Sequence, residues 1–266
     1  MYAFSYRRPA SIEEAASLLV DHEDAKLLAG GQTLLPTMKQ RLAAPSLIVD
    51  LGGIPGLRGI TIANGVVTVG AMTRHADLLA DPALTGAFPG LCRLAGTVGD
   101  PAVRNRGTVG GSVANFDPAA DYPASLLAVN GTIETNRRSI AASDFFLGLF
   151  ETALEEGEIV TRVSWPIPRR SGWEKFANPA SRYALAAVFV VDIDGEPGVG
   201  VTGAGQNGAF RSIEIEDALR VRGFVPEALD GISLDEDEMN ADIHASARYR
   251  AHLVVEMARR AVARMV

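Results

Sequence analysis

The segment TVGGSVANFDPAAD (residues 108–121) joins two adjacent glycines to a cluster of small polar residues, shortly before the apolar run SLLAVNG. Glycine leaves the backbone bare, so a ligand can approach it closely. The polar side chains can bond to the hydroxyl groups of a ligand: Thr108, Ser112, Asn115, Asp117 and Asp121. This pattern predicts a ligand-binding loop. The alternative is a polar loop whose aspartate caps the next helix.

A second glycine pair occurs in LLAGGQTLL (residues 27–35), which is typical of a buried strand, a Gly-Gly turn and a helix. The start of a helix offers free N–H groups and a positive dipole end, and both favour a phosphate. The segment lacks the Gly-Lys-Ser/Thr ending of a P-loop. By itself it fits a plain tight turn slightly better. Two phosphate-type loops in one domain, however, favour a dinucleotide over a mononucleotide.

A third stretch, GAGQNG (residues 203–208), matches the G-x-G-x-x-G pattern of a Rossmann NAD site, with Glu227 at a plausible distance. We favour a loop between a strand and a helix. Asn207-Gly208 is a turn pair, and Pro197 with Gly198 marks the preceding segment as a hairpin. No second strand–helix–strand unit follows, and a lone match of this kind is weak.

Hydrophobic periodicity predicts mixed secondary structure. Alternating apolar residues around Asn64-Gly65 predict a β-hairpin over 60–70. Helices are expected at 11–20, 33–42, 74–81, 88–96, 212–220 and 244–265, and strands at 25–31, 46–51, 131–136, 157–168, 183–193 and 198–205. The acidic segment 234–243 is expected to be a solvated loop. Proline, charge and glycine in PRRSGW (168–173) predict a break and a domain boundary.

Composition excludes several classes of protein. The 266 residues suffice for one large or two medium domains, and 47% hydrophobic with 21% charged residues is an ordinary globular balance. A net charge of −7 argues against a nucleic-acid binder. The single cysteine, Cys92, excludes an intrachain disulfide and an iron–sulfur cluster held by this chain alone.

No metal site and no membrane segment are expected. The four histidines are scattered without metal-ligand spacing. The N-terminal stretch MYAFSYRRP has no apolar core of signal-peptide length, and no apolar run approaches the length of a membrane span. We therefore expect a cytoplasmic protein.

These segments, in this order, resemble a known family: the FAD-binding medium subunit of molybdenum hydroxylases, as in bacterial carbon monoxide dehydrogenase and the flavin domain of xanthine dehydrogenase. The resemblance covers almost the whole chain, and its most specific part is the second glycine loop. It rests on YRRPASIEEAASLL (6–19), LLAGGQTLLPTMKQRL (27–42), PAVRNRGTVGGSVANFDPAADYPASLLAVNGTIE (101–134), GWEKFANPASRYALAAV (172–188) and ADIHASARYRAHLVVEMARRAV (241–262).

The resemblance implies an α+β fold in two parts. A two-part FAD-binding domain of the vanillyl-alcohol-oxidase (PCMH) type would span residues 1–168. A small α+β C-terminal domain of the carbon monoxide dehydrogenase flavoprotein type would span residues 169–266.

The resemblance also assigns residues to FAD. The pyrophosphate would be cradled, largely through backbone N–H groups, by Ala29, Gly30, Gly31, Gln32, Thr33, Thr108, Gly110, Gly111 and Ser112. Leu27, Leu28 and Leu34 would flank the first loop, with Lys26 at its entrance. Asn115 and Asp121 would bond ribityl or ribose hydroxyls, and Val98 and Gly107 would line the same cleft. Tyr183 would pack against the isoalloxazine ring; the alternative is an ordinary core tyrosine.

The implied function is electron transfer. A cofactor carries the redox chemistry and the protein supplies position and electrostatics, so no catalytic side chain is expected on this chain. Partners would be a small subunit with [2Fe–2S] clusters and a large molybdenum–pterin subunit, in a dimer of heterotrimers. An alternative is a stand-alone FAD-dependent reductase of related fold, for which no proton-donating acid stands out. A scaffold protein without FAD is disfavoured by the intact pair of loops.

Overall fold

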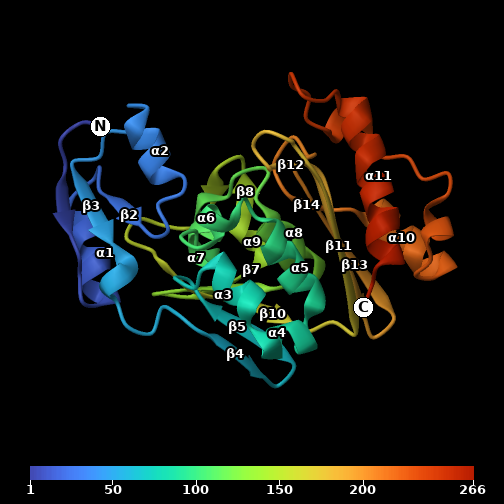
Figure 1. Cartoon of the computed structure of the whole chain (residues 1–266), viewed down its shortest axis with the longest axis horizontal. Helices are drawn as coiled ribbons and strands as arrows, with labels where there is room; N and C mark the ends of the chain where they lie inside the picture. The colour runs from blue at the N-terminus through green and yellow to red at the C-terminus, as the bar shows by residue number, and fades with distance from the viewer.

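The computed structural model describes residues 1–266, which form three parts arranged side by side (Figure 1). A small N-terminal lobe lies at one end, a larger middle part follows, and a sheet covered by helices lies at the other end. The predicted α+β fold class is confirmed by this mixture of helices and sheets.

The N-terminal lobe is a three-stranded parallel sheet in the order β1-β3-β2. Its elements are β1 (Ser5–Arg7), α1 (Ile12–Asp21), β2 (Lys26–Leu28), α2 (Leu34–Lys39), β3 (Leu47–Asp50) and the 3-10 turn η1 (Leu51–Gly53). Helix α1 begins where predicted because the Ser11 side chain accepts a hydrogen bond from the Glu14 N–H, while Glu14 accepts one from the Ala10 N–H. The lobe has its own small apolar core, which includes Val49 and Ile159.

The middle part is a five-stranded antiparallel sheet in the order β4-β5-β10-β6-β7, covered by short helices. Asn64 and Gly65 both have positive φ, as the predicted hairpin requires. The strands are β4 (Ile60–Ala63), β5 (Val66–Gly70), β6 (Thr132–Thr135), β7 (Ser139–Ala141) and β10 (Val160–Pro166), with a side hairpin of β8 (Phe146–Gly148) and β9 (Glu151–Thr152). The helices are α3 (His75–Ala80), α4 (Pro82–Ala87), α5 (Pro89–Thr97), α6 (Pro101–Arg104), α7 (Val109–Asn115), α8 (Asp121–Ala128) and α9 (Ala142–Phe145).

The C-terminal part is a four-stranded antiparallel sheet, β11-β12-β13-β14, that is covered on both faces. Helix α11 packs on one face and α8 on the other, so nearly every residue of β12 is buried (Figure 1). Its elements are β11 (Arg170–Ala177), β12 (Ala184–Ile193), β13 (Glu196–Thr202), β14 (Phe210–Arg211), α10 (Ile213–Arg222), η2 (Pro226–Leu229), η3 (Glu236–Glu238) and α11 (Ala247–Ala263). None of the helices has the length and apolarity needed to cross a membrane.

The predicted break at residues 168–173 is wrong over its last four residues, because strand β11 begins at Arg170. Trp173 is almost fully buried and donates a hydrogen bond to the Thr97 hydroxyl at 3.0 Å. Gly172 lies against the backbone of α11, where a Cβ would stand 2.1 Å from the Ala261 carbonyl oxygen. Long-range packing therefore makes a strand from residues of low strand propensity. The proposed domain division at residue 168 falls between β10 and β11.

The segment 203–208 forms no nucleotide-binding strand–helix unit. It connects β13 to the short strand β14, and helix α10 begins only after that strand. The expectation of a loop after a strand is confirmed, with one further strand before the helix.

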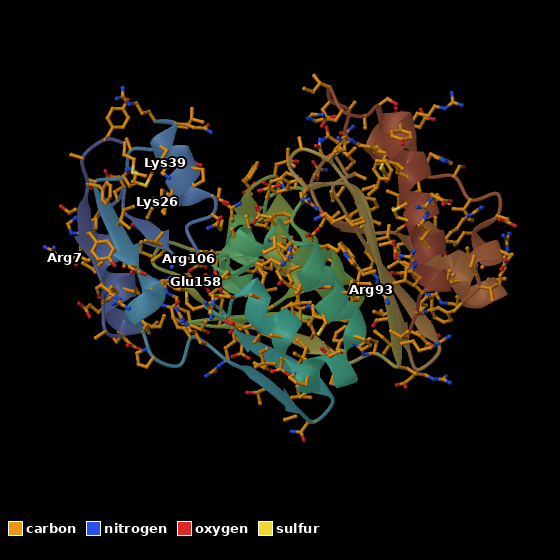
Figure 2. The ribbon with its side chains drawn as sticks, in the orientation of Figure 1. Arg7, Lys26, Lys39, Arg93, Arg106 and Glu158 are labelled. Carbon is orange, nitrogen blue, oxygen red and sulfur yellow. The ribbon has the colours of Figure 1, made fainter.

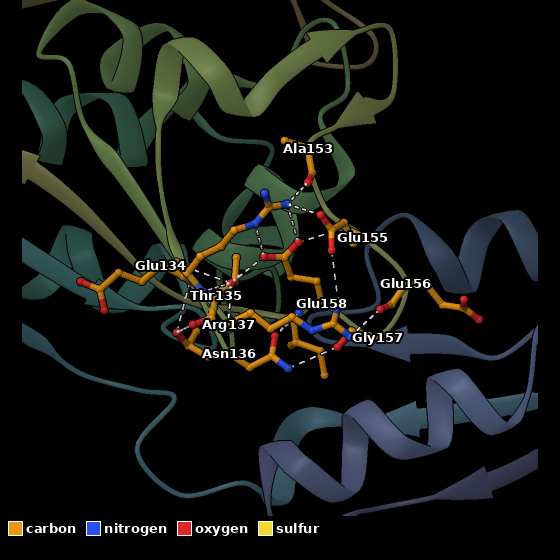
Figure 3. Close-up of polar contacts among 12 residues, drawn as sticks. Glu134, Thr135, Asn136, Arg137, Ala153, Glu155, Glu156, Gly157 and Glu158 are labelled. Carbon is orange, nitrogen blue, oxygen red and sulfur yellow. Dashed lines mark hydrogen bonds and ion pairs between the residues drawn. The ribbon is translucent and has the colours of Figure 1, made fainter.

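A buried carboxylate lies beside the junction between the N-terminal lobe and the middle sheet (Figure 3). The Glu158 side chain is fully buried and accepts hydrogen bonds from Arg138 at 2.9 and 3.0 Å and from the Thr135 hydroxyl at 2.8 Å. Next to it, Asn136 bonds to the Ile159 N–H and the Gly157 carbonyl. Because Ile159 belongs to the core of the N-terminal lobe, this network ties the two parts together.

We expect Glu158→Gln to lower the free energy of unfolding by ~3 kcal/mol at pH 7. The hydrogen bonds from Arg138 lower the pKa of Glu158 from 4.5 to about 2. This stabilisation is therefore fully present above pH 4.5 and is lost as the pH falls towards 2. Urea denaturation at pH 7 and pH 3 measures it. The matched control is Glu155→Gln, because Glu155 also pairs with Arg138 but is 63% exposed. Equal losses for the two variants would contradict the prediction.

Candidate functional site

A cleft of about 760 Å³ lies between the N-terminal lobe and the middle part, and the residues before β12 reach its rim. Every predicted cofactor-binding residue except Leu28 lines it: Lys26, Leu27, Ala29, Gly30, Gly31, Gln32, Thr33, Leu34, Val98, Gly107, Thr108, Gly110, Gly111, Ser112, Asn115, Asp121 and Tyr183. Leu28 follows Leu27 on strand β2, so its side chain points to the other face of the strand. Sequence reasoning did not single out several further lining residues: His75, Phe150, Ile159, Lys175 and Arg182.

The first glycine loop, residues 29–33, presents unpaired backbone donors. None of its five N–H groups donates a hydrogen bond within the chain. The loop lies directly on the second glycine segment, where a Cβ on Gly30 would stand 2.4 Å from the Arg106 carbonyl oxygen and 2.6 Å from the Gly107 Cα. Successive unpaired N–H groups in the lining of one cleft suit an anionic ligand such as a pyrophosphate.

The second glycine segment supplies close packing and side chains. Thr108 caps α7 by accepting a hydrogen bond from the Gly111 N–H at 3.2 Å. The N–H groups of residues 109–112 all bond within the chain, so they leave no donors for a ligand. Gly110 lies against Ala71, directly after β5, where a Cβ would stand 2.4 Å from the Ala71 Cβ. The polar side chains of Ser112 and Asn115 make no hydrogen bond within the chain and line the cleft.

Two cationic residues stand where the N-terminal lobe meets the middle part (Figure 2). Lys26 begins strand β2, and Arg106 precedes the second glycine segment. Both are exposed, and neither forms an ion pair within the chain. Positive charge at this end of the cleft favours the same anionic ligand as the free N–H groups.

A buried ion pair closes the far side of the cleft. The Lys175 ammonium bonds to Asp121 Oδ2 at 2.7 Å, and both side chains are 4% exposed. The second oxygen, Oδ1, is buried without a hydrogen-bond partner. Burial raises the pKa of Asp121 to about 6, although Lys175 opposes the shift. An acceptor of this kind is suited to a ligand hydroxyl.

Lys175 is a residue that sequence reasoning missed. It shares a face of β11 with Trp173, two residues earlier, and that face is buried. A lysine on the apolar face of a strand is the signal that could have identified it, because an isolated charge is not buried without a partner.

His75 lies next to the start of the second glycine segment and bonds to its backbone. Its Nδ1 lies 2.9 Å from the buried Tyr122 hydroxyl, and its backbone N–H donates to the Gly107 carbonyl at 3.2 Å. Burial, with the nearby charge of Arg104, lowers the pKa of His75 to about 4, so the ring is neutral at pH 7. The pKa of Tyr122 is raised well above 10 by burial, so its O–H is the donor of the pair.

Two aromatic residues stand at the mouth of the cleft. Tyr183 is 48% exposed, which rules out the alternative of a core tyrosine. Phe150 is 61% exposed and has a φ of 57°. Flat aromatic surfaces beside a cleft suit stacking on a planar ring.

Free N–H groups, bare glycine backbone and an unpaired carboxylate oxygen fit a dinucleotide that carries phosphates and hydroxyl groups. The cleft and its α+β frame therefore define a dinucleotide-binding protein. Residues 2–168 match the family model described as the FAD binding domain in molybdopterin dehydrogenase. The chain belongs to this family.

Individual relatives agree with this result. The chain is 38% identical over 273 residues to the nicotine 6-hydroxylase medium subunit of Paenarthrobacter nicotinovorans, covering 98% of this chain and 96% of the relative. It is 41% identical over 196 residues to the carbon monoxide dehydrogenase medium chain of Hydrogenophaga pseudoflava, covering 71% and 68%. A chain of the reconstituted CO dehydrogenase from Oligotropha carboxidovorans superposes with a TM-score of 0.91 at 34% identity, covering 98% and 97%. The protein is thus an FAD-binding oxidoreductase subunit of the molybdenum hydroxylase type.

Proposed function

We propose that this chain is the electron-transfer subunit of a molybdenum-containing hydroxylase or dehydrogenase. The observation that supports this most strongly is a single cleft lined by five residues with unpaired N–H groups, by the second glycine segment and by Asp121. When bound, FAD supplies reversible redox chemistry, and the protein supplies position and electrostatics.

The proposed roles of the residues follow from their chemistry. The N–H groups of residues 29–33 bind the pyrophosphate, and the side chains of Ser112 and Asn115 bond to polar groups beside it. Asp121 Oδ1 accepts a hydrogen bond from a ribityl or ribose hydroxyl. Tyr183 packs against the isoalloxazine ring and limits the access of water to that side of it.

The need for separate cluster-bearing subunits follows from the cysteine content of this chain, and their identity follows from the family. Its one cysteine, Cys92, is buried, and burial raises the pKa of its thiol, so it does not serve as a cluster ligand. We propose that a small subunit holds the [2Fe–2S] clusters and a large subunit holds the molybdenum–pterin, in a dimer of heterotrimers. Electrons then pass from the clusters through this subunit to an external acceptor.

The purified chain is expected to show the visible absorption bands of a flavin, and heat denaturation is expected to release FAD into the supernatant. Absorption spectra before and after heating, with chromatography of the released flavin, measure this. A colourless chain that takes up no added FAD would contradict the proposal.

Turnover assays test the electron-transfer role. The FAD-loaded chain is expected to oxidise no substrate by itself and to be reduced when the iron–sulfur and molybdenum partners and their substrate are added. Substrate turnover by the isolated chain would instead identify a stand-alone reductase.

A further inference from the structure

The C-terminal sheet holds the segment that leads to Asp121. At the end of β13, the fully buried Thr202 hydroxyl lies 2.8 Å from the Ala120 carbonyl oxygen, to which it donates. The Gly203 N–H donates to the Pro118 carbonyl at 3.1 Å. Both contacts cross from the C-terminal part to the backbone immediately before α8.

Helix α8 itself lies directly on β13. A Cβ on Gly200 would stand 1.8 Å from the Ala124 carbonyl oxygen, and one on Gly198 would stand 2.0 Å from the Ala128 carbonyl oxygen. The two glycines therefore allow the helix backbone to contact the strand backbone without side chains between them. Because the two backbones are in contact, the position of β13 fixes the position of α8.

The third glycine stretch, residues 203–208, has a structural role in the same place. Gly208 has a φ of 98°, and a Cβ there would stand 2.9 Å from the ring of Phe116. Phe116 ends helix α7 in the left-handed conformation. The stretch therefore supports the connection between α7 and α8, the two helices that carry Asn115 and Asp121.

No side chain next to Asp121 in the sequence holds its orientation. The residue before it, Ala120, makes no side-chain cap for α8, and Asp121 Oδ2 is already bonded to Lys175. Asp121 lines the cleft, and the place of its buried, unpaired Oδ1 depends on the backbone of the first turn of α8 as well as on Lys175. The Thr202 hydroxyl is the side-chain donor that bonds to this backbone.

We propose that Thr202 is a positioning residue: through the Ala120 carbonyl it holds the first turn of α8 so that Asp121 Oδ1 meets a hydroxyl of FAD. The proposal rests on the FAD-binding role of Asp121. It makes the C-terminal sheet, which contributes no glycine loop to the cleft, a determinant of cofactor affinity.

A double-mutant cycle on the full chain tests this. The FAD dissociation constant is measured by quenching of flavin fluorescence on cofactor-stripped protein. Thr202→Val keeps the volume and removes the hydroxyl, and it is expected to weaken FAD binding about tenfold. Thr202→Ser keeps the hydroxyl and is expected to stay within about twofold of the wild type. In the Asp121→Ala/Lys175→Met background, which removes both charges, Thr202→Val is expected to change the affinity less than about twofold.

Control variants distinguish the specific effect of Thr202 from misfolding and from the loss of any buried hydroxyl. Thr68→Val removes a hydroxyl that bonds to Ser164 in the middle sheet, 3.0 Å away, and is expected to bind FAD like the wild type. Thr202→Cys weakens the donor at similar size and replaces Thr202→Val if that variant does not fold. An equal loss with and without Asp121, or no recovery with serine, overturns the proposal. A wild-type chain that binds no FAD overturns the proposed function instead.

Discussion

Replacing Gly30 by alanine is expected to weaken FAD binding at least ~100-fold, which corresponds to ~2.7 kcal/mol. The new Cβ would stand 2.4 Å from the Arg106 carbonyl oxygen and 2.6 Å from the Gly107 Cα, and both are backbone atoms that cannot rotate away. The two glycine segments must therefore separate. Residues 29–33, with their unpaired N–H groups, would then no longer line one cleft together with the second segment.

The matched control for this prediction is Gly86→Ala on helix α4. Nothing lies within 4 Å of a Cβ at Gly86, and its φ is negative, so alanine fits there without strain. Isothermal titration of cofactor-stripped protein with FAD measures both variants, and circular dichroism shows whether each is folded. A folded Gly30→Ala variant with wild-type affinity would refute the role of the first loop.

Removing the partner of Asp121 has the second large effect. Lys175→Met is expected to lower the free energy of unfolding by ~3–5 kcal/mol at pH 8, because it leaves the Asp121 carboxylate buried without its ion-pair partner. Burial already raises the pKa of Asp121 from 3.8 to about 6, and the lost lysine raises it further. When folding raises the pKa of a carboxyl group, the free energy of unfolding falls as the pH rises towards and through that pKa. The loss is therefore expected to be smaller at pH 5, where Asp121 is largely protonated in both proteins.

Urea denaturation at pH 5 and pH 8 measures this difference. Lys39→Met on α2 is the control, since Lys39 is exposed and forms no ion pair within the chain, and it is expected to change stability little (Figure 2). The double variant Asp121→Asn/Lys175→Met is expected to regain most of the lost stability. A loss below ~1 kcal/mol at pH 8, or one that does not depend on pH, would show that the pair is not electrostatically buried.

Local signals in the sequence were sufficient for the elements with strong periodicity and for the first glycine loop. The loop expected at residues 108–121 instead contains helix α7 (Val109–Asn115), whose backbone hydrogen bonds use the N–H groups of residues 109–112. Ser11 caps α1 and Asn64-Gly65 turns the hairpin because these residues act through neighbours in the chain. Strand β11 was missed because its first residues have low strand propensity. It forms because Trp173 is buried and Gly172 lies against α11.

The residues of the cleft show the same difference between local sequence signals and long-range contacts. All but Leu28 lie together in one cleft, as the paired loops indicated. Lys175 and His75 were not predicted, because their importance depends on Asp121 and Tyr122, which are distant in sequence. The two glycine segments also differ in their backbone donors. The N–H groups of residues 29–33 are free, whereas those of residues 109–112 form hydrogen bonds within the chain.

The sequence by itself determined the family-specific glycine segments, the approximate positions of the periodic helices and the absence of thiolates for a cluster, because these depend on residue type and short-range spacing. Only the tertiary structure decided that Gly30 lies on Gly107, that Lys175 pairs with Asp121, and that the third glycine stretch supports α7 and α8. Such contacts join residues many positions apart. Their energies depend on burial and on the close approach of backbones, which a linear pattern does not contain.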